Sequence, residues 1–378
     1  MAFAAAISEH PLATHAIGEV IGQVLERLGP EPDAALLFAT APFAGAFEDL
    51  AAAVHATLSP GSLVGATAAS VIGGGREVEG GAAISLFAAN VGARIRTVRF
   101  EPRDGAPGGP TVAADLELAG VRGTLVLLAE PRVGVADLID ELTVVAPDLQ
   151  VVGGIASAPG GNRLAVDRTT IDRGAVGLLL PPSIAAMPVL SQGADPVGDP
   201  FVVTRSSGRM IDEIAGRPAL DLLLAAAAAA SPEDRSRMAR SLELGVAVDE
   251  RRPELERDDF LLVPVLGADK ERRAVAVGRE VAVGTTVQFH VRDRVAADDD
   301  LRALLAGAPG RAALAFTSTA RGVDLFGAPH HDAAILADHV ESGAVAGMFT
   351  AGEVGPVGGR SALHDRSASI LLLDAAAP

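Results

Sequence analysis

Short apolar runs alternate with amphipathic segments along this chain, in an order that predicts a unit of secondary structure. Residues 34–40 are almost wholly apolar, which is typical of a buried strand. Residues 47–58 carry apolar side chains at helical spacing, and a Pro-Gly pair then ends the predicted helix. A second strand over 63–70 enters a glycine-rich loop at 73–76, and a third strand follows over 82–89.

The same order of strand, helix, strand, glycine-rich loop and strand occurs twice more. The second copy has these five segments at residues 123–128, 135–142, 151–157, 160–163 and 175–180, and the third has them at 312–316, 332–341, 344–350, 352–360 and 368–373. Because the first two copies begin about 90 residues apart and the spacing is irregular, the pattern indicates duplication and not a solenoid. We place an N-cap at Asp332, before the third helix.

Each glycine-rich loop ends in an arginine, at Arg76, Arg163 and Arg360. Glycines permit positive φ and let backbone N–H groups approach a ligand. Three loops that met at one place would line a common cleft, but the sequence leaves that convergence open. For Arg76 and Arg163, a solvated hairpin turn is the simpler interpretation.

The repeats predict an α+β fold of β-α-β-β units that form a layered αββα-type sandwich. A stretch rich in proline and small residues over 181–200 predicts a boundary near residue 190, and hence two domains, 1–190 and 191–378. Between the second and third repeats we expect a helix over 219–230 and a second helix that Ser231 caps together with Asp234.

Composition excludes several classes of protein. The 378 residues are 49% hydrophobic, enough for a sizeable core, and they contain no Cys, Trp or Tyr. The absence of Cys rules out disulfides, thiolate metal sites and cysteine nucleophiles. A net charge of −17 argues against nucleic acid as a partner. The longest apolar run, 222–230, is far shorter than the roughly 20 residues of a membrane span, so we expect a cytoplasmic protein.

The third glycine-rich loop carries a recognisable motif. Gly-Glu-Val-Gly-Pro at 352–356, followed by Leu-His at 363–364, resembles the signature of the C-terminal domain of the FIST family, the F-box and intracellular signal transduction proteins. The Arg-Gly and Leu-Phe-Gly segments within 321–327 are similar to that family as well. Residues 63–70 and 153–157 resemble its N-terminal domain, so the resemblance covers almost the whole chain.

The resemblance implies a cytoplasmic sensory module that binds a small molecule such as an amino acid and passes this state to a separate signalling protein. Relatives often carry Cys at the positions of Ala66, of Thr317 or Ser318, and of Thr350. Any role that depends on a thiol is therefore excluded here, whereas the glutamate and histidine of the motif are present.

The candidate ligand site is built around Glu353 and Arg360. Arg360 could hold a ligand carboxylate in two hydrogen bonds and Glu353 could pair with an ammonium group, which suits a zwitterion such as an amino acid. The alternative is that these two side chains pair with each other and brace a turn. The other ligand-binding candidates are His364, Arg321, Thr67, Ser157 and Gly352.

The sequence gives little evidence for a catalytic site, a metal site or a cofactor. His330, His331 and Asp332 lack the spacing of metal ligands, and neither a Gly-x-Ser-x-Gly elbow nor a phosphate-binding loop occurs. We therefore expect no cofactor, no metal and no catalytic residue. Two alternatives stay open: a hydrolase or lyase that uses Glu353 and His364 as acid and base, and a scaffold without a ligand that binds proteins through its loops.

Overall fold

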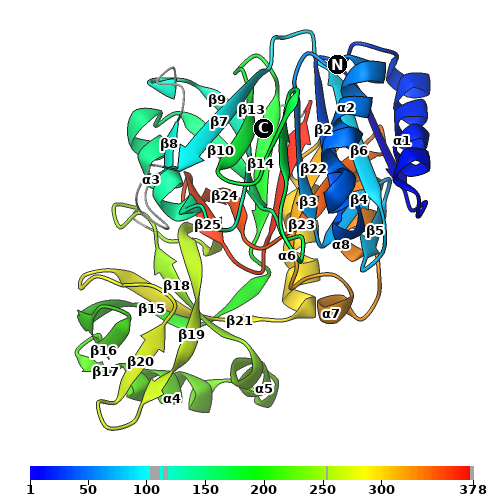
Figure 1. Ribbon diagram of the computed structural model, residues 1–378. Helices are drawn as coiled ribbons and strands as arrows, with labels where there is room; N and C mark the ends of the chain where they lie inside the picture. Colours follow the sequence, from blue (N-terminus) through cyan, green and yellow to red (C-terminus); the bar gives the residue numbers. More distant parts are fainter. Residues whose placement is uncertain (103–110, 114–117, 253, 375–378) are drawn as a thin grey trace. The chain divides into compact units, whose positions relative to one another are not determined.

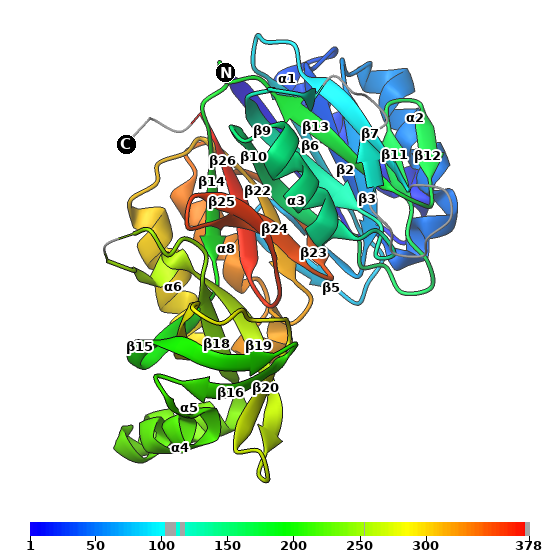
Figure 2. The same cartoon turned by 90° about the vertical axis from the view of Figure 1, so that its left-hand side faces the viewer.

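The computed structural model describes residues 1–102, 111–113, 118–252 and 254–374 (Figures 1 and 2). The chain divides into two compact units. Unit 1 contains residues 1–190, 302–356 and 361–378, and unit 2 contains residues 191–301 and 357–360. This division differs from the predicted domains 1–190 and 191–378, because the third repeat folds with the first two. The predicted α+β class in two domains is confirmed.

In the first repeat the strand predicted over 34–40 and the helix predicted over 47–58 have the predicted bounds, whereas the strand predicted over 63–70 ends at residue 68 and the strand predicted over 82–89 spans 84–90. Its elements, with the strand and helix that precede them, are β1 (Ala2–Ser8), α1 (Ala13–Leu28), β2 (Ala34–Thr40), a 3₁₀ helix (Ala41–Ala46), α2 (Phe47–Leu58), β3 (Leu63–Ala68), β4 (Ser70–Gly73), β5 (Arg76–Glu79) and β6 (Ile84–Asn90). Helix α2 buries its apolar face, including Phe47 and Leu58, and ends at Ser59 in the left-handed conformation. The loop predicted at 73–76 is the tip of the β4–β5 hairpin.

The second and third repeats have the same plan. The second contains β9 (Gly123–Ala129), α3 (Val135–Val145), β10 (Leu149–Ile155), the hairpin β11 (Leu164–Val166) and β12 (Thr169–Ile171), and β13 (Ala175–Leu180). The third contains β22 (Ala312–Ser318), α7 (Val323–Phe326), α8 (His331–His339), β23 (Ala344–Thr350), the hairpin β24 (Glu353–Val357) and β25 (Arg360–His364), and β26 (Ala368–Leu373). Strands β7 (Arg96–Pro102), β8 (Thr111–Ala113) and β14 (Ala186–Ser191) complete the sheets of unit 1.

Each repeat donates its hairpin to the sheet of another repeat, in a closed cycle. The first, second and third sheets, each named after the repeat whose parallel strands it contains, run β1-β6-β2-β3-β11-β12, β25-β24-β10-β9-β13-β7-β8 and β14-β26-β22-β23-β4-β5. The hairpin of repeat 1 thus extends the third sheet, that of repeat 2 the first sheet, and that of repeat 3 the second sheet. Strand pairing therefore links all three repeats.

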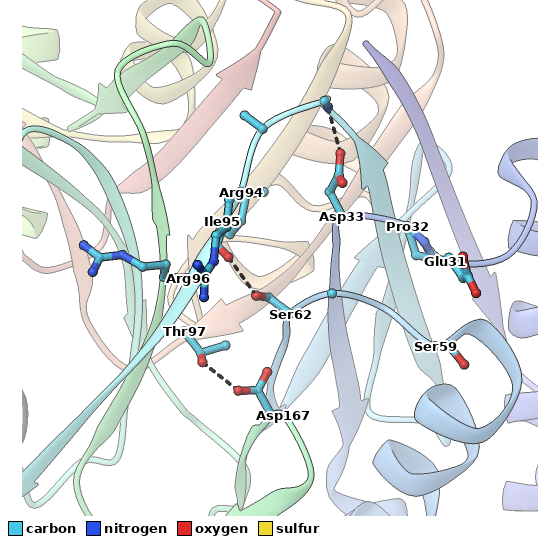
Figure 3. A pocket seen from close by; sticks show the side chains of 13 residues that line it. Glu31, Pro32, Asp33, Ser59, Ser62, Arg94, Ile95, Arg96, Thr97 and Asp167 are labelled. Atoms are coloured by element: carbon cyan, nitrogen blue, oxygen red, sulfur yellow. Dashed lines mark hydrogen bonds between the residues drawn. The ribbon is translucent and has the colours of Figure 1, made fainter.

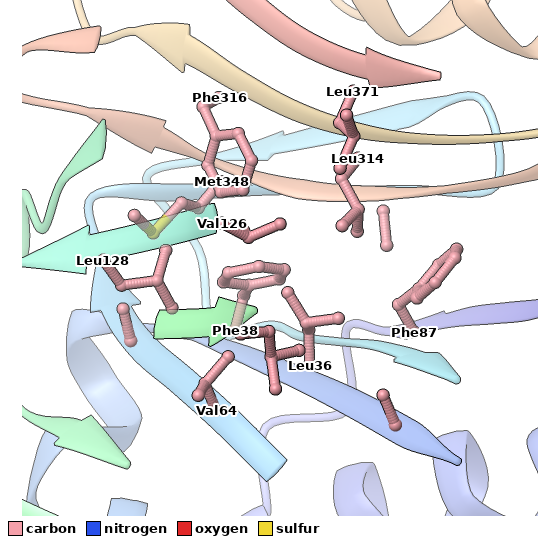
Figure 4. Packing of buried hydrophobic residues seen from close by; sticks show 14 of the residues in the cluster. Leu36, Phe38, Val64, Phe87, Val126, Leu128, Leu314, Phe316, Met348 and Leu371 are labelled. Atoms are coloured by element: carbon pink, nitrogen blue, oxygen red, sulfur yellow. The ribbon is translucent and has the colours of Figure 1, made fainter. Parts of the chain in front are cut away.

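The inner faces of the three sheets share one apolar core. Phe38 of the first sheet, Val126 and Leu128 of the second, and Phe316 and Met348 of the third belong to a single buried cluster (Figure 4). Helices α1 and α2 cover the outer face of the first sheet, and α3 covers the outer face of the second. The first and second sheets thus have the predicted layering, with helices outside and sheets inside, and the third sheet completes the core.

A glycine at one equivalent position permits the parallel strands of each repeat to approach closely. Gly65, Gly153 and Gly347 lie opposite Leu37, Leu127 and Ala315 in the strand registers. A Cβ at these glycines would lie 2.4, 2.0 and 1.8 Å from the carbonyl oxygen of the partner residue. Contacts this short cannot be tolerated, so only glycine fits this position in all three copies.

The glycine-rich loops are not equivalent in the three repeats. In repeats 1 and 3, Gly74–Gly75 and Gly358–Gly359 have positive φ and form the hairpin tips. In repeat 2 the tip falls after β11, at Asp167, whereas the glycines at 160 and 161 precede the hairpin. Arg163 is consequently not the structural counterpart of Arg76 and Arg360.

Unit 2 is a small barrel. Its strands β15 (Ala194–Ser207), β21 (Thr286–Arg292), β18 (Leu242–Ala247), β19 (Phe260–Asp269), β20 (Ala274–Val277), β16 (Met210–Ile214) and β17 (Arg217–Pro218) form one sheet in this order. Since β15 also pairs with β16, the sheet closes. Its other elements are α4 (Ala219–Ala229), α5 (Pro232–Arg240), a 3₁₀ helix (Arg257–Asp259) and α6 (Arg294–Ala306), which contains the boundary with unit 1.

The helix predicted over 219–230 and the cap predicted at Ser231 are confirmed. Asp234 donates its backbone N–H to the Ser231 hydroxyl at 3.0 Å. Among the described residues, no helix has the length and apolar character needed to cross a membrane.

Candidate functional site

The carboxyl ends of the parallel strands from all three repeats meet at Ser157, in unit 1. Its hydroxyl accepts a hydrogen bond from the backbone N–H of Ala69 at 3.0 Å and donates one to the carbonyl of Phe349 at 2.6 Å. Ala69 follows β3, Ser157 follows β10, and Phe349 lies at the end of β23. One half-buried side chain therefore joins the three repeats at the end of the sheets where α/β proteins commonly bind ligands.

Glu353 lies beside this junction, at the first position of β24, and is fully buried. The Thr350 hydroxyl donates to its Oε1 at 2.7 Å, and the backbone N–H of Ser367 donates to its Oε2 at 2.9 Å. Gly352 precedes it and accepts a hydrogen bond from the backbone of Ile155. These bonds fix the carboxylate between the second and third sheets, because β24 pairs with β10 while Thr350 and Ser367 belong to the third repeat.

Arg321 forms a buried ion pair below the end of β22. Its Nε and Nη2 donate to the two oxygens of Asp332 at 2.7 and 2.9 Å, and both side chains are 1% exposed. The Thr317 hydroxyl also donates to Asp332, and the Phe326 ring faces the guanidinium. Burial alone would raise the pKa of Asp332, but the Arg321 charge and the hydrogen bonds from His331 and Arg321 hold it well below its usual range.

Asp332 is not the N-cap that the sequence predicts. Helix α8 begins at His331 after His330, which adopts the left-handed conformation and makes no side-chain cap. The Asp332 carboxylate binds Arg321 instead, because a two-oxygen pairing with a buried guanidinium satisfies more donors than one backbone N–H would.

The remaining predicted residues are divided between the two units. Buried His364 lies next to Gly352 and places Nε2 3.2 Å from the carbonyl of Gly355. Buried Thr67 accepts a hydrogen bond from the backbone N–H of Arg163, where hairpin β11–β12 joins β3. Arg360 is exposed and belongs to unit 2. Unit 1 thus brings together Glu353, Gly352, His364 and Ser157, and connects them to Arg321 through Thr350 and Thr317.

Glu77 is a buried acid that the sequence analysis missed. It lies on β5 with its side chain under α8, where Oε1 accepts a hydrogen bond from the backbone N–H of Ala333 at 3.0 Å. Its Oε2 is buried and has no hydrogen-bond partner among the described residues. Burial, together with the nearby Asp332 charge, raises the pKa of Glu77 from 4.5 to about 7. The sequence of β5 offers only a weak signal for this burial, because charged and apolar residues do not alternate strictly in it.

A cavity of about 890 Å³ lies at the opposite, amino ends of β2 and β3 (Figure 3). Its walls include Asp33, Ser62, Arg94, Arg96 and Asp167. None of its lining residues belongs to the cluster around Glu353. Sequence reasoning missed this cavity, whose lining comes from four separate stretches of the chain.

Comparison with known proteins identifies domains of one family over most of the chain. The FIST N domain matches residues 33–217, and the FIST C domain matches residues 219–356. The uncharacterized protein Rv0628c of Mycobacterium tuberculosis is 35% identical over 392 aligned residues, which cover 97% of this chain and 98% of the relative. The uncharacterized protein Mb0898c of Mycobacterium bovis is 34% identical over 374 residues, covering 96% of both chains.

Proposed function

Because this chain belongs to the FIST family, whose domains are associated with signal transduction and small-ligand sensing, we propose that it is a cytoplasmic sensor of an amino acid. The observation that carries the proposal is the hydrogen-bonded junction at Ser157, where the three repeats meet. A ligand at this junction contacts three repeats at once, so its binding energy acts on the pairing between them. The resulting change in the pairing between the repeats is then passed to a separate signalling protein.

The charges near the junction suit a zwitterion. Glu353 supplies a fixed negative charge for an ammonium group, and Arg321 is the nearest buried cation of the same network. A protein of net charge −17 repels anions at long range, so a ligand carboxylate requires such a local cation. Buried, hydrogen-bonded charges are costly to maintain and are a common property of binding sites.

Arg360 remains a separate prediction for a ligand carboxylate, because it belongs to unit 2 whereas Glu353 and Arg321 belong to unit 1. Its guanidinium is exposed, and a two-oxygen hydrogen-bonded pair with a carboxylate is the arrangement that this side chain favours. Substitution of Arg360 by Ala separates its role from that of Arg321.

The test is a thermal-shift screen of the full-length chain against the standard amino acids, followed by calorimetric titration of any that stabilise it. We expect Glu353→Gln to weaken binding of the stabilising amino acid by tenfold or more, since it removes a charge-assisted contact worth about 1.5–3 kcal/mol. Ser157→Ala should weaken it as well, because the junction loses its bridge.

Glu243→Gln is the matched control, because Glu243 is equally buried but lies in unit 2. Unchanged affinity in both Glu353→Gln and Ser157→Ala would refute the site. Loss of affinity in Arg360→Ala supports that residue's assignment, and unchanged affinity in this variant removes it. Stabilisation by no amino acid would refute the proposed ligand class.

A further inference from the structure

The cavity at the amino ends of β2 and β3 has two properties of a ligand site, a suitable volume and a rim that carries several arginines beside the exposed Glu31. Its volume of about 890 Å³ falls within the range typical of small-molecule pockets. A neighbouring hollow of about 600 Å³ shares Ser59, Gly61, Thr97 and Asp167 with it. We refer to the two together as the amino-end cavity.

Two carboxylates hold the walls of the amino-end cavity in place. Asp33 accepts hydrogen bonds from the backbone N–H groups of Val91 and Gly92, each at 2.7 Å. Asp167 accepts one from the backbone N–H of Leu63 at 3.1 Å and one from the Thr97 hydroxyl at 2.6 Å. Figure 3 shows the hydrogen bond between Asp167 and Thr97. Both acids are therefore engaged in fixing loops, and the donors around them offset their negative charge.

Asp167 also connects two sheets. It follows β11 of the first sheet, while Thr97 lies on β7 of the second sheet. Ser62, just before β3 of the first sheet, makes a second contact, since its hydroxyl donates to the carbonyl of Ile95, just before β7, at 3.1 Å. The cavity is thus formed by the pairing of distant segments and is preorganised before any ligand arrives.

Four arginines surround the cavity. Strand β7 and the residues just before it contribute Arg94, Arg96 and Arg99, whose side chains are exposed because Ile95, Val98 and Phe100 take the buried positions. Exposed Arg168 follows Asp167 at the tip of the β11–β12 hairpin. Arg94 and Arg168 make no hydrogen bond or ion pair with any other residue that the structure describes, so their donors are available to a ligand.

We propose that the amino-end cavity binds a small multivalent anion, either a phosphate ester or a di- or tricarboxylate. Guanidinium groups bind both kinds of oxyanion through paired hydrogen bonds, which explains the use of arginine at this rim. Because the overall charge of −17 repels anions at long range, the arginines at this rim supply the local positive charge that an anion requires, although Arg99 also pairs with Glu101 at 3.1 Å. This site is separate from the proposed amino-acid site, since it uses the other end of the strands.

The experiment measures binding of two probes, inorganic pyrophosphate and citrate, to the full-length chain by calorimetry at low ionic strength. We expect at least one probe to bind, and we expect Arg94→Ala and Arg168→Ala each to weaken binding by about tenfold or more. Arg94→Lys retains the charge but loses the paired geometry, so it should bind with intermediate affinity. Raising the salt concentration should weaken binding in every case.

Arg122→Ala is the control, because Arg122 is an exposed arginine of unit 1 that does not line the cavity. Binding of pyrophosphate alone assigns the site to phosphate esters, and binding of citrate alone assigns it to carboxylates. Failure of both probes, or an equal loss of affinity in Arg122→Ala and Arg94→Ala, overturns the proposal. Glu353→Gln should bind these probes normally, so failure of the amino-acid site is distinguishable from failure of this one.

Discussion

Glu77 gives a prediction whose size follows from its burial. The side chain is 3% exposed, one carboxylate oxygen has no partner among the described residues, and the pKa is raised from 4.5 to about 7. The folded protein keeps this proton up to about pH 7, whereas the unfolded chain releases it near pH 4.5. Stability from this group is therefore fully present below pH 4.5 and is lost as the pH rises through 7.

The loss amounts to about 3 kcal/mol, at about 1.4 kcal/mol for each tenfold change in proton affinity. Glu77→Gln removes the ionisation but keeps an acceptor for the backbone N–H of Ala333. We therefore expect the free energy of unfolding of the variant, relative to that of the wild type, to increase by up to about 3 kcal/mol from pH 5 to pH 8. In a unit of this size, that corresponds to roughly 6–12 °C in melting temperature.

The assay follows urea and thermal unfolding at pH 5, 6.5 and 8 by far-ultraviolet circular dichroism, because the chain has no Trp or Tyr to provide a fluorescence signal. Glu48→Gln, at an exposed position in the first turn of α2, is the control and should give a difference independent of pH. A Glu77→Gln effect that is equal at pH 5 and pH 8 would show that the carboxylate ionises normally in the folded state, and the reasoning from burial would then be wrong.

Three further predictions concern other buried groups. Burial lowers the pKa of His290 to about 4, so stability should fall by up to about 3 kcal/mol as the pH drops from 6.5 to 4. His290→Leu should abolish this pH dependence of the free energy of unfolding, measured by urea titration. Gly347→Ala would place a Cβ 1.8 Å from a carbonyl of β22 and should lower the free energy of unfolding in urea by more than about 3 kcal/mol. Gly22→Ala on α1, where a Cβ meets nothing within 4 Å, should instead stabilise the protein by up to about 1 kcal/mol. Arg321→Ala leaves Asp332 buried without its cation and should cost about 3–5 kcal/mol, and a double-mutant cycle with Asp332→Ala should show a total well below the sum of the single losses.

Local patterns predict the secondary structure of the repeats well. Helix 47–58 has the predicted bounds because its apolar spacing and the Pro-Gly pair that follows are both local signals. The cap at Ser231 is confirmed for the same reason. The strand over 34–40 is buried throughout, as a continuous apolar run implies.

Such local patterns do not predict the exchange of hairpins between repeats. Strand pairing depends on residues far apart in the chain, and a β-hairpin such as β4–β5 has no sequence feature that selects β23 over the strands of its own repeat. The same limit explains the position of Arg163. A Gly-Gly pair with an arginine one or two positions after it occurs in all three copies, yet only in repeats 1 and 3 does the pair form the hairpin tip.

The candidate site is predicted in part. The motif residues Glu353 and Gly352 and the strand-end residue Ser157 lie together, because the carboxyl ends of parallel strands meet in a closed arrangement of sheets. The sequence predicts a capping role for Asp332, because nothing in it indicates that Arg321, eleven residues earlier, folds back onto this carboxylate. The amino-end cavity is invisible in the sequence, since its walls form only when β7 and the hairpin after Val166 are brought together.

The cyclic sharing of hairpins has a consequence for biosynthesis. On the ribosome, the first 190 residues emerge with the strands of the first sheet and with those of the second sheet except β24 and β25. Strand β23, which receives hairpin β4–β5, is encoded after residue 301. At 5–20 residues per second, this interval lasts on the order of ten seconds. During that time the apolar inner faces of the first two sheets and the unpaired edge of β4 are exposed to other nascent chains, which makes this intermediate a natural client for chaperones.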